Sequence, residues 1–280
     1  MGNVQSKSTM LILVWCLFIF TSFAANVSCL TDEEINEFGA RTHIDPNTDL
    51  QGFITIAEHD DDTLVVTSNG IPDHTAGPFA LPPDADDILE QDFEFYISKN
   101  PTSSNAKYEL PMGPVGLALN GVALFNPYSN EGTDAVITEG PTFDDCDGHP
   151  TPNGIYHYHS SPFCVFSDQD GVPSTIIGVA LDGFPIYGPN DENGNELYSA
   201  DLDACHGRYV DGNYRYHITE DFPYILGCFH GEVDSRNLRP GQNLATVDPG
   251  VTMTTSKASD IVHGSVTIVT MLFSLLFVLF

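Results

Sequence analysis

The chain repeats part of its own sequence. Residues 116–127, GLALNGVALFNP, align without a gap with residues 178–189, GVALDGFPIYGP, at an offset of 62 positions. Residues 153–159, NGIYHYH, also align without a gap with residues 211–217, DGNYRYH, at an offset of 58 positions. Landmarks that recur in the same order indicate a duplicated structural unit, which restricts the fold to architectures made of two related halves.

Each copy has the pattern of short strands joined by tight turns. Asn-Gly or Asp-Gly pairs follow the apolar runs, and both residues of such a pair tolerate the positive φ that hairpin turns require. The best helical candidate is residues 32–40, where Thr31 precedes the segment and Glu34 follows three positions later. We therefore expect a mainly β fold, a single domain of two duplicated halves with few short helices.

One pair of cysteines belongs to each copy. Cys146 and Cys164 fall in the first unit, at about 116–164, and Cys205 and Cys228 in the second, at about 178–228. The repeat predicts that each pair forms a disulfide within its own copy, although four cysteines permit three pairings. Disulfides are typical of exported proteins, so the cysteines favour an oxidising compartment.

Both ends of the chain resemble processing signals. Residues 1–29 have the charge, apolar run and small residues of a secretory signal peptide, and residues 257–280 form an apolar tail. The tail indicates either a GPI-attachment signal, with Ser256 as the attachment residue, or a membrane span. Asn26 begins a glycosylation sequon. We expect a secreted glycoprotein that meets the membrane only through its C-terminal anchor, on the outer cell surface.

Between these signals the sequence predicts three regions. An N-terminal segment, 30–44, precedes the β domain at 45–232, and residues 233–256, rich in Pro, Gly, Thr and Asn, read as a stalk.

The chain is strongly acidic, with 39 Asp and Glu against nine Lys and Arg and a formal charge of −30. Such a surface repels phosphate backbones, which excludes nucleic acids as partners. Short carboxylates on loops suit weak calcium binding, with a solvated surface as the alternative for any one cluster. The candidate calcium ligands are Asp60, Asp61, Asp62, Asp144, Asp145, Asp147 and Asp191, and a further acidic run lies at 84–87.

Three motifs are specific enough to suggest a family. They are Tyr156-His157-Tyr158-His159, the run LDGFPIYGP at 181–189, and Cys146-Asp147-Gly148-His149. In these motifs the chain resembles the YHYH domain family over roughly residues 50 to 230. The resemblance implies a shared domain but no particular activity, so the chemistry has to be read from the residues.

The histidines are the main candidates for chemistry. On a strand, residues two apart share a face, so His157 and His159 point together and can offer two imidazoles to Zn, Cu or Fe. Arg215 stands where His157 stands in the first copy, which disfavours a second metal site. If a metal binds, we therefore expect a single ion, in the first half or at the seam between the halves. A buried hydrogen-bonded network and a metal-free catalytic histidine remain open. The candidate metal ligands are His149, His157, His159, His206 and His217.

Two functions of different classes follow. The favoured one is an acidic extracellular matrix-type protein without enzymatic activity, which binds calcium, mineral surfaces or basic proteins, as in biomineralisation. It is favoured because the histidine ligand set is incomplete in the sequence. The alternative is a His-coordinated metalloenzyme with Cu, Fe or Zn, redox-active given the adjacent tyrosines. Nucleophile elbows, phosphate loops and dinucleotide fingerprints are absent from the sequence.

Overall fold

The structure, a computed structural model, describes residues 30–79, 88–167 and 169–247. The sites expected at Asn26 and Ser256, the terminal signals and the acidic run at 84–87 lie outside these residues. The fold is mainly β, as predicted, with one large sheet and two smaller ones.

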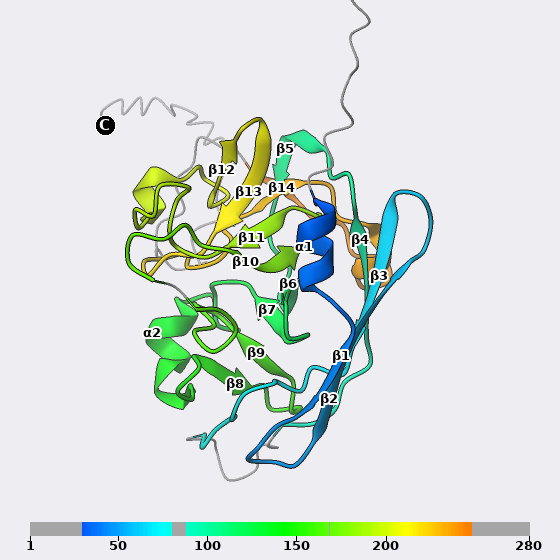
Figure 1. The fold of residues 1–280 in the computed structure, drawn as a ribbon, viewed down its shortest axis with the longest axis vertical. Helices are drawn as coiled ribbons and strands as arrows, with labels where there is room; N and C mark the ends of the chain where they lie inside the picture. The colour runs from blue at the N-terminus through cyan, green and yellow to red at the C-terminus, as the bar shows by residue number, and fades with distance from the viewer. Residues whose placement is uncertain (1–29, 80–87, 168, 248–280) are drawn as a thin grey trace, which may run out of the picture.

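The large sheet has eight strands and is arranged symmetrically (Figure 1). The first half occupies one side of it and the second half the other, each with its strands in the same relative order. In sheet order the strands are β12 (Gly207–Val210), β13 (Asn213–His217), β11 (Pro185–Tyr187), β10 (Ile176–Ala180), β6 (Pro114–Ala118), β7 (Ala123–Phe125), β9 (Tyr156–Tyr158) and β8 (Gly148–Pro150).

The two halves meet at the antiparallel pair β6 and β10. Leu117 faces Val179 at the centre of this pair, and these two residues are equivalent in the repeat. The glycines beside them allow the strands to approach, because a Cβ on Gly178 would lie 2.5 Å from the Leu117 carbonyl oxygen. On the other strand, a Cβ on Gly116 would lie 2.8 Å from the Val179 carbonyl oxygen. The duplication is therefore a pseudo-two-fold arrangement about this seam.

Each half is stapled by its own disulfide, as the repeat predicts. Cys146 is bonded to Cys164 and Cys205 to Cys228. Next to each bridge a carboxylate organises the turn, and it is buried in the first half and exposed in the second. Asp144 Oδ1 accepts hydrogen bonds from the amides of Cys146 and Gly148, and Asp203 Oδ1 accepts the corresponding pair in the second half. A tyrosine hydroxyl, Tyr156 or Tyr214, completes each cluster.

The first smaller sheet is an antiparallel meander along one side of the large sheet (Figure 1). Alternate residues of its third strand, including Leu64 and Val66, are buried in the common core, and Ser68 donates to the Gly121 carbonyl at 2.6 Å. Its strands are β1 (Arg41–Ile44), β2 (Gln51–Glu58), β3 (Thr63–Ser68) and β4 (Phe93–Ser98).

The second small sheet is formed by segments far apart in the chain. Its order is β14 (Phe229–Gly231), β5 (Ser103–Tyr108) and β15 (Thr246–Val247). Since β1 begins at Arg41 and β15 pairs with β5, packed structure continues on both sides of the predicted 45–232 domain.

The helices are short. Helix α1 (Asp32–Glu37) starts with the predicted capping box of Thr31 and Glu34. The other elements are α2 (Ala135–Glu139) and the 3-10 turns η1 (Gly140–Thr142), η2 (Ser199–Asp201) and η3 (Ser235–Asn237). No helix among residues 30–79, 88–167 and 169–247 is long and apolar enough to cross a membrane.

Candidate metal centre

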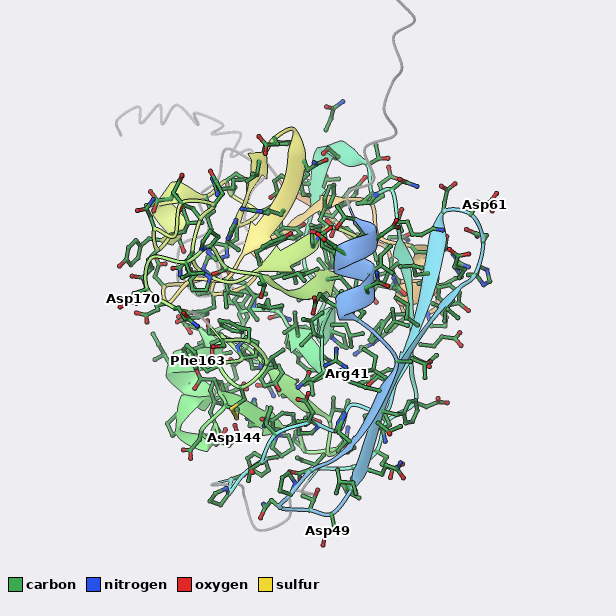
Figure 2. The ribbon with its side chains drawn as sticks, viewed as in Figure 1. Arg41, Asp49, Asp61, Asp144, Phe163 and Asp170 are labelled. Carbon is green, nitrogen blue, oxygen red and sulfur yellow. A yellow bond between two sulfur atoms is a disulfide. The ribbon has the colours of Figure 1, made fainter. Side chains whose placement is uncertain are left out.

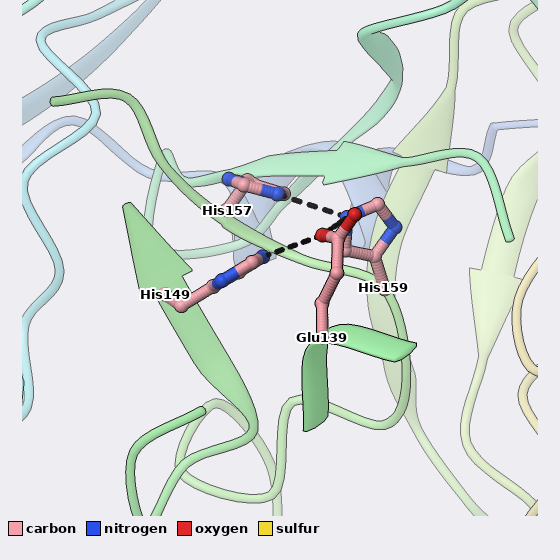
Figure 3. A group of neighbouring side chains, drawn as sticks. All are labelled: Glu139, His149, His157 and His159. Atoms are coloured by element: carbon pink, nitrogen blue, oxygen red, sulfur yellow. Dashed lines mark hydrogen bonds and ion pairs between the residues drawn. The ribbon is translucent and has the colours of Figure 1, made fainter. Parts of the chain in front are cut away.

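Four potential metal ligands converge in the first half (Figure 3). His149 lies on β8, His157 on β9, His159 just after β9, and Glu139 at the end of α2. One ligand atom from each residue lies within 4.8 Å of the others. The three histidines are buried and the carboxylate is half-buried, so the cluster is largely shielded from solvent.

Local structure explains why these side chains meet. His149 and His157 are direct partners across the antiparallel pair β8 and β9, and such partners lie on one face of a sheet. His159 is two residues beyond His157 and so projects to the same side. Helix α2 is capped by Asp134, whose carboxylate accepts the Ile137 amide, and it ends at Glu139 above that face.

The second ring nitrogens of His157 and His159 fix their tautomers. The His157 Nδ1 donates to the Ile155 carbonyl at 3.0 Å, and the His159 Nδ1 donates to the Asn126 carbonyl at 2.6 Å. A carbonyl only accepts, so the proton of each neutral ring is on Nδ1. Both Nε2 atoms are then bare lone pairs, yet they lie 3.0 Å apart.

His149 has the same tautomer for a related reason. The Thr142 hydroxyl donates to the Glu139 carbonyl at 2.6 Å, so its oxygen accepts from His149 Nδ1, at 2.8 Å. The buried Nε2 of His149 has no hydrogen-bond partner. Three imidazole lone pairs and a carboxylate oxygen thus face one another, an arrangement that is repulsive unless a cation lies between them.

Burial disfavours a positive charge on the rings of His149 and His157. Burial, followed by the proximity of His159 and His149, holds the pKa of His157 well below its ordinary value. Burial also lowers the pKa of His149, against the opposing effect of Glu139. Burial alone would raise the pKa of Glu139, but its contacts with His149 and His159 outweigh burial and bring that pKa to about 2. The neutral imidazoles and ionised carboxylate are the forms that bind metals.

The spacing of the ligand atoms fits a transition metal. Glu139 Oε2 lies 3.4 Å from His149 Nε2 and 3.5 Å from His159 Nε2, and the nearest imidazole pair is 3.0 Å apart. Metal bonds of about 2.0–2.2 Å in a tetrahedral arrangement separate neighbouring ligand atoms by about 3.3–3.6 Å. These three separations are close to that range, and all four ligand atoms lie within 4.8 Å of one another.

The second half has cations where these ligands face one another. Arg208 and Arg215 are strand partners equivalent to His149 and His157, and His217 corresponds to His159. The His217 Nδ1 donates to the Gly188 carbonyl at 2.8 Å, and its Nε2 accepts from Arg215 Nε at 3.0 Å and Arg208 Nε at 3.4 Å. In the second half, guanidinium groups thus satisfy the lone pair of His217. In the first half, the groups around the equivalent His159 are potential metal ligands.

The structure separates the remaining metal candidates from this cluster. His206 is buried in the second half, where its Nδ1 contacts the Ile225 carbonyl and its Nε2 contacts the hydroxyls of Ser199 and Thr219. His217 is taken up by the arginines. Of the five predicted histidines, His149, His157 and His159 therefore come together. Glu139, which completes the set, was not predicted.

The predicted calcium ligands lie in different places, and Figure 2 shows two of them, Asp61 and Asp144, on different sides of the molecule. Residues 60–62 are exposed in the turn between β2 and β3, and Asp145 is exposed near β8. Asp144 is buried and accepts from three backbone amides and the Tyr156 hydroxyl. Asp147 accepts from Ser160 at 3.2 Å, and Asp191 accepts the amides of its own turn. Among the described residues, these carboxylates do not form a common cluster.

A cavity of about 450 Å³ opens beside the four ligands, all of which line it. The ring of Phe125 stacks on His157 with centroids 3.9 Å apart and forms part of the wall. The fold and site thus define a duplicated, disulfide-linked β domain with a His₃Glu cluster in one half.

The family model described as YHYH protein matches residues 94–196 and 191–231. The chain therefore carries a YHYH domain and belongs to that family. The first matched segment contains the His₃Glu cluster, and the second contains Arg208 and Arg215. No curated protein and no solved structure is detectably similar to the chain.

Proposed function

We propose that this protein is an extracellular metalloprotein that holds one transition-metal ion through Glu139, His149, His157 and His159. The observation that carries the proposal is the convergence of three bare Nε2 atoms, each fixed by a hydrogen bond at Nδ1. Metal-binding histidines ordinarily have such partners on the second nitrogen, because these partners orient the ring and raise its basicity.

The donor set indicates which metals fit. Three imidazoles and one carboxylate suit Zn, Cu or Fe, whereas calcium and magnesium prefer all-oxygen sites. Structural zinc sites are usually closed by four protein ligands, but this cluster borders a cavity that leaves space for a further ligand. The geometry therefore favours a centre that binds or converts a small molecule over a purely structural one.

The tyrosines support packing rather than redox chemistry. Tyr156 and Tyr158 are buried on the opposite face of β9, where the Tyr156 hydroxyl donates to Asp144 and the Tyr158 hydroxyl contacts His74 and Asn120. They do not line the metal cavity. A radical role for them is not part of the proposal.

Elemental analysis of the purified protein, with metal titration of the apoprotein, tests the proposal. We expect one Zn, Cu or Fe per chain and, for Glu139→Gln, an affinity at least about tenfold lower, since even partners of ligands contribute 10–100-fold. Glu192→Gln is the matched control, because Glu192 contacts the arginines of the second half. Absence of a retained metal, or equal affinity of the two variants, overturns the proposal.

Extracellular location and calcium or mineral binding stay predictions. The two disulfides support export, because such bonds persist in oxidising compartments. The acidic surface supports weak attraction of cations, but no described cluster of carboxylates favours a particular calcium site. If the purified protein holds no transition metal and calcium raises its melting temperature, the matrix-scaffold interpretation would be supported instead.

A further inference from the structure

The cavity over the metal cluster has the size of a small-molecule site. Its volume of about 450 Å³ falls within the roughly 300–1,000 Å³ typical of such sites. It is partly open to solvent and is lined by Glu139, His149, His157 and His159, so a molecule that enters it reaches the metal position.

The wall of the cavity is mostly apolar and includes aromatic and proline rings. Phe125, Tyr128, Pro150 and Pro152 contribute rings, and Met112 contributes a thioether held by Asn126, whose Nδ2 lies 3.5 Å from Met112 Sδ. Rings and thioethers contact an aromatic face favourably, by stacking, edge contacts and sulfur contacts. A ligand with a ring-sized apolar body fits this wall.

The charges around the cavity disfavour an ionic ligand. Among the described residues that line it there is no lysine or arginine, and the only acidic one, Glu139, is a metal ligand in the proposed function. A net charge of −30 on the chain repels anions over a longer range. The charge of the chain opposes an anionic ligand and the proposed metal ion opposes a cationic one, which leaves a neutral ligand.

The second half shows that the fold does not require an open cavity here. At the equivalent place Arg208 and Arg215 fill the space beside His217, and Glu192 closes over them as an ion pair to both. The Arg215 guanidinium also stacks 4.3 Å from the ring centre of Tyr187, the counterpart of Phe125. Protein side chains thus occupy this place in the second half, whereas in the first half a cavity adjoins the equivalent residues.

We infer that the cavity binds a phenol: a small uncharged molecule whose ring rests against Phe125, Tyr128 and Met112 and whose hydroxyl oxygen joins the four protein ligands as a fifth ligand of the metal. This inference rests on the proposed function, because the metal supplies the polar anchor. Binding transfers no group and needs no co-reactant.

Cobalt(II) in place of the native metal tests the inference, because its visible absorption changes when a ligand joins the coordination shell. Titrations of the cobalt-loaded protein with phenol, methanol and benzoate separate the contributions of ring and charge. We expect phenol to saturate the spectral change at a concentration at least about tenfold lower than either comparator, a difference of about 1.4 kcal/mol.

Two substitutions place the ligand in the cavity. Met112 and Val172 are both about half exposed, at 51% and 46%, so an aspartate is tolerated at either position. Met112→Asp puts a carboxylate at the mouth of the cavity and is expected to weaken phenol binding about tenfold with unchanged cobalt content. Val172→Asp, between the two repeat units and away from the cavity, is expected to leave both values unchanged.

The outcomes separate the two proposals. If cobalt is held one to one but phenol leaves the spectrum unchanged, or benzoate binds as tightly, or Val172→Asp weakens binding as much as Met112→Asp, the phenol inference is wrong and the metal centre stands. If no cobalt is held stoichiometrically, both fall.

Discussion

A single histidine position shows how this domain uses its two halves. His159 and His217 are equivalent in the repeat, and each donates Nδ1–H to a carbonyl, of Asn126 or Gly188, so that Nε2 is left to accept. In the second half two arginines satisfy that lone pair. In the first half its neighbours are other lone pairs and a carboxylate, which only a cation reconciles.

Thr142 is a positioning residue for this centre. Its hydroxyl oxygen accepts from His149 Nδ1, which fixes the tautomer that presents Nε2 to the metal. We expect Thr142→Val to lower metal affinity about 10–100-fold, measured by competition with a chelator. Thr138→Val, at an exposed position of the preceding helix α2, is the control. Equal affinities in the two variants would show that Thr142 has no such role.

Asp182 makes stability depend on pH. Burial raises its pKa from 3.8 to about 6, although the Tyr216 hydroxyl and the Gly231 amide donate to it. The folded protein therefore holds a proton that the unfolded chain releases, and this contribution to the free energy of unfolding is lost as pH rises from about 4 through 6. The loss is on the order of 3 kcal/mol.

The Asp182→Asn variant tests this contribution, because the first half has Asn120 at the equivalent turn. Urea unfolding at pH 4 and pH 7 is the measurement. We expect the wild type to lose stability relative to the Asp182→Asn variant between pH 4 and pH 7. A difference that is the same at both pH values would contradict the assignment.

At the scale of elements, β8 and β9 form the platform of the metal site, and one disulfide joins its ends. Cys146 lies just before β8 and Cys164 follows β9, so His149, His157 and His159 all lie within the bridged loop of 18 residues. The second bridge, Cys205 to Cys228, encloses the arginine cluster with a separation of 23.

The two bridges therefore differ in what their loss removes. Each double Cys→Ser variant is expected to lower the free energy of unfolding by about 2–5 kcal/mol. Loss of the Cys146–Cys164 bridge should also lower metal affinity, whereas loss of the Cys205–Cys228 bridge should leave the affinity of the folded protein unchanged. Metal titration under conditions in which both variants are folded distinguishes them, and the reverse order of affinities would refute this division of roles.

For the whole molecule, the seam between β6 and β10 holds the two halves in one sheet. A Cβ at position 178 would lie 2.5 Å from a backbone oxygen of Leu117, so the strands would have to separate. We expect Gly178→Ala to destabilise the protein by roughly 2 kcal/mol or more. Gly140→Ala, where nothing lies within 4 Å of the added Cβ, is the control in thermal unfolding. Similar melting temperatures would show that the seam can relax.

Much of this architecture follows from patterns that are local in the sequence. The repeat, its Asn-Gly and Asp-Gly turns and the paired cysteines predict the symmetric sheet and its bridges, and the spacing of His157 and His159 places both on one face. Glu139 could not be predicted, because it lies in a segment without a counterpart in the alignment and reaches the histidines only when α2 folds over β8 and β9. The sequence could not exclude Asp144 as a calcium ligand, because its burial and its internal hydrogen-bond donors depend on tertiary contacts.

The central claim is that the first half holds one metal where the second half holds two arginines. Anomalous X-ray diffraction from crystals of the metal-loaded protein tests it directly. The account predicts one strong peak, about 2.0–2.2 Å from the Nε2 atoms of His149, His157 and His159 and from a Glu139 oxygen, and none beside His217. A map without a peak at these atoms, with the three imidazoles still in contact, would contradict it.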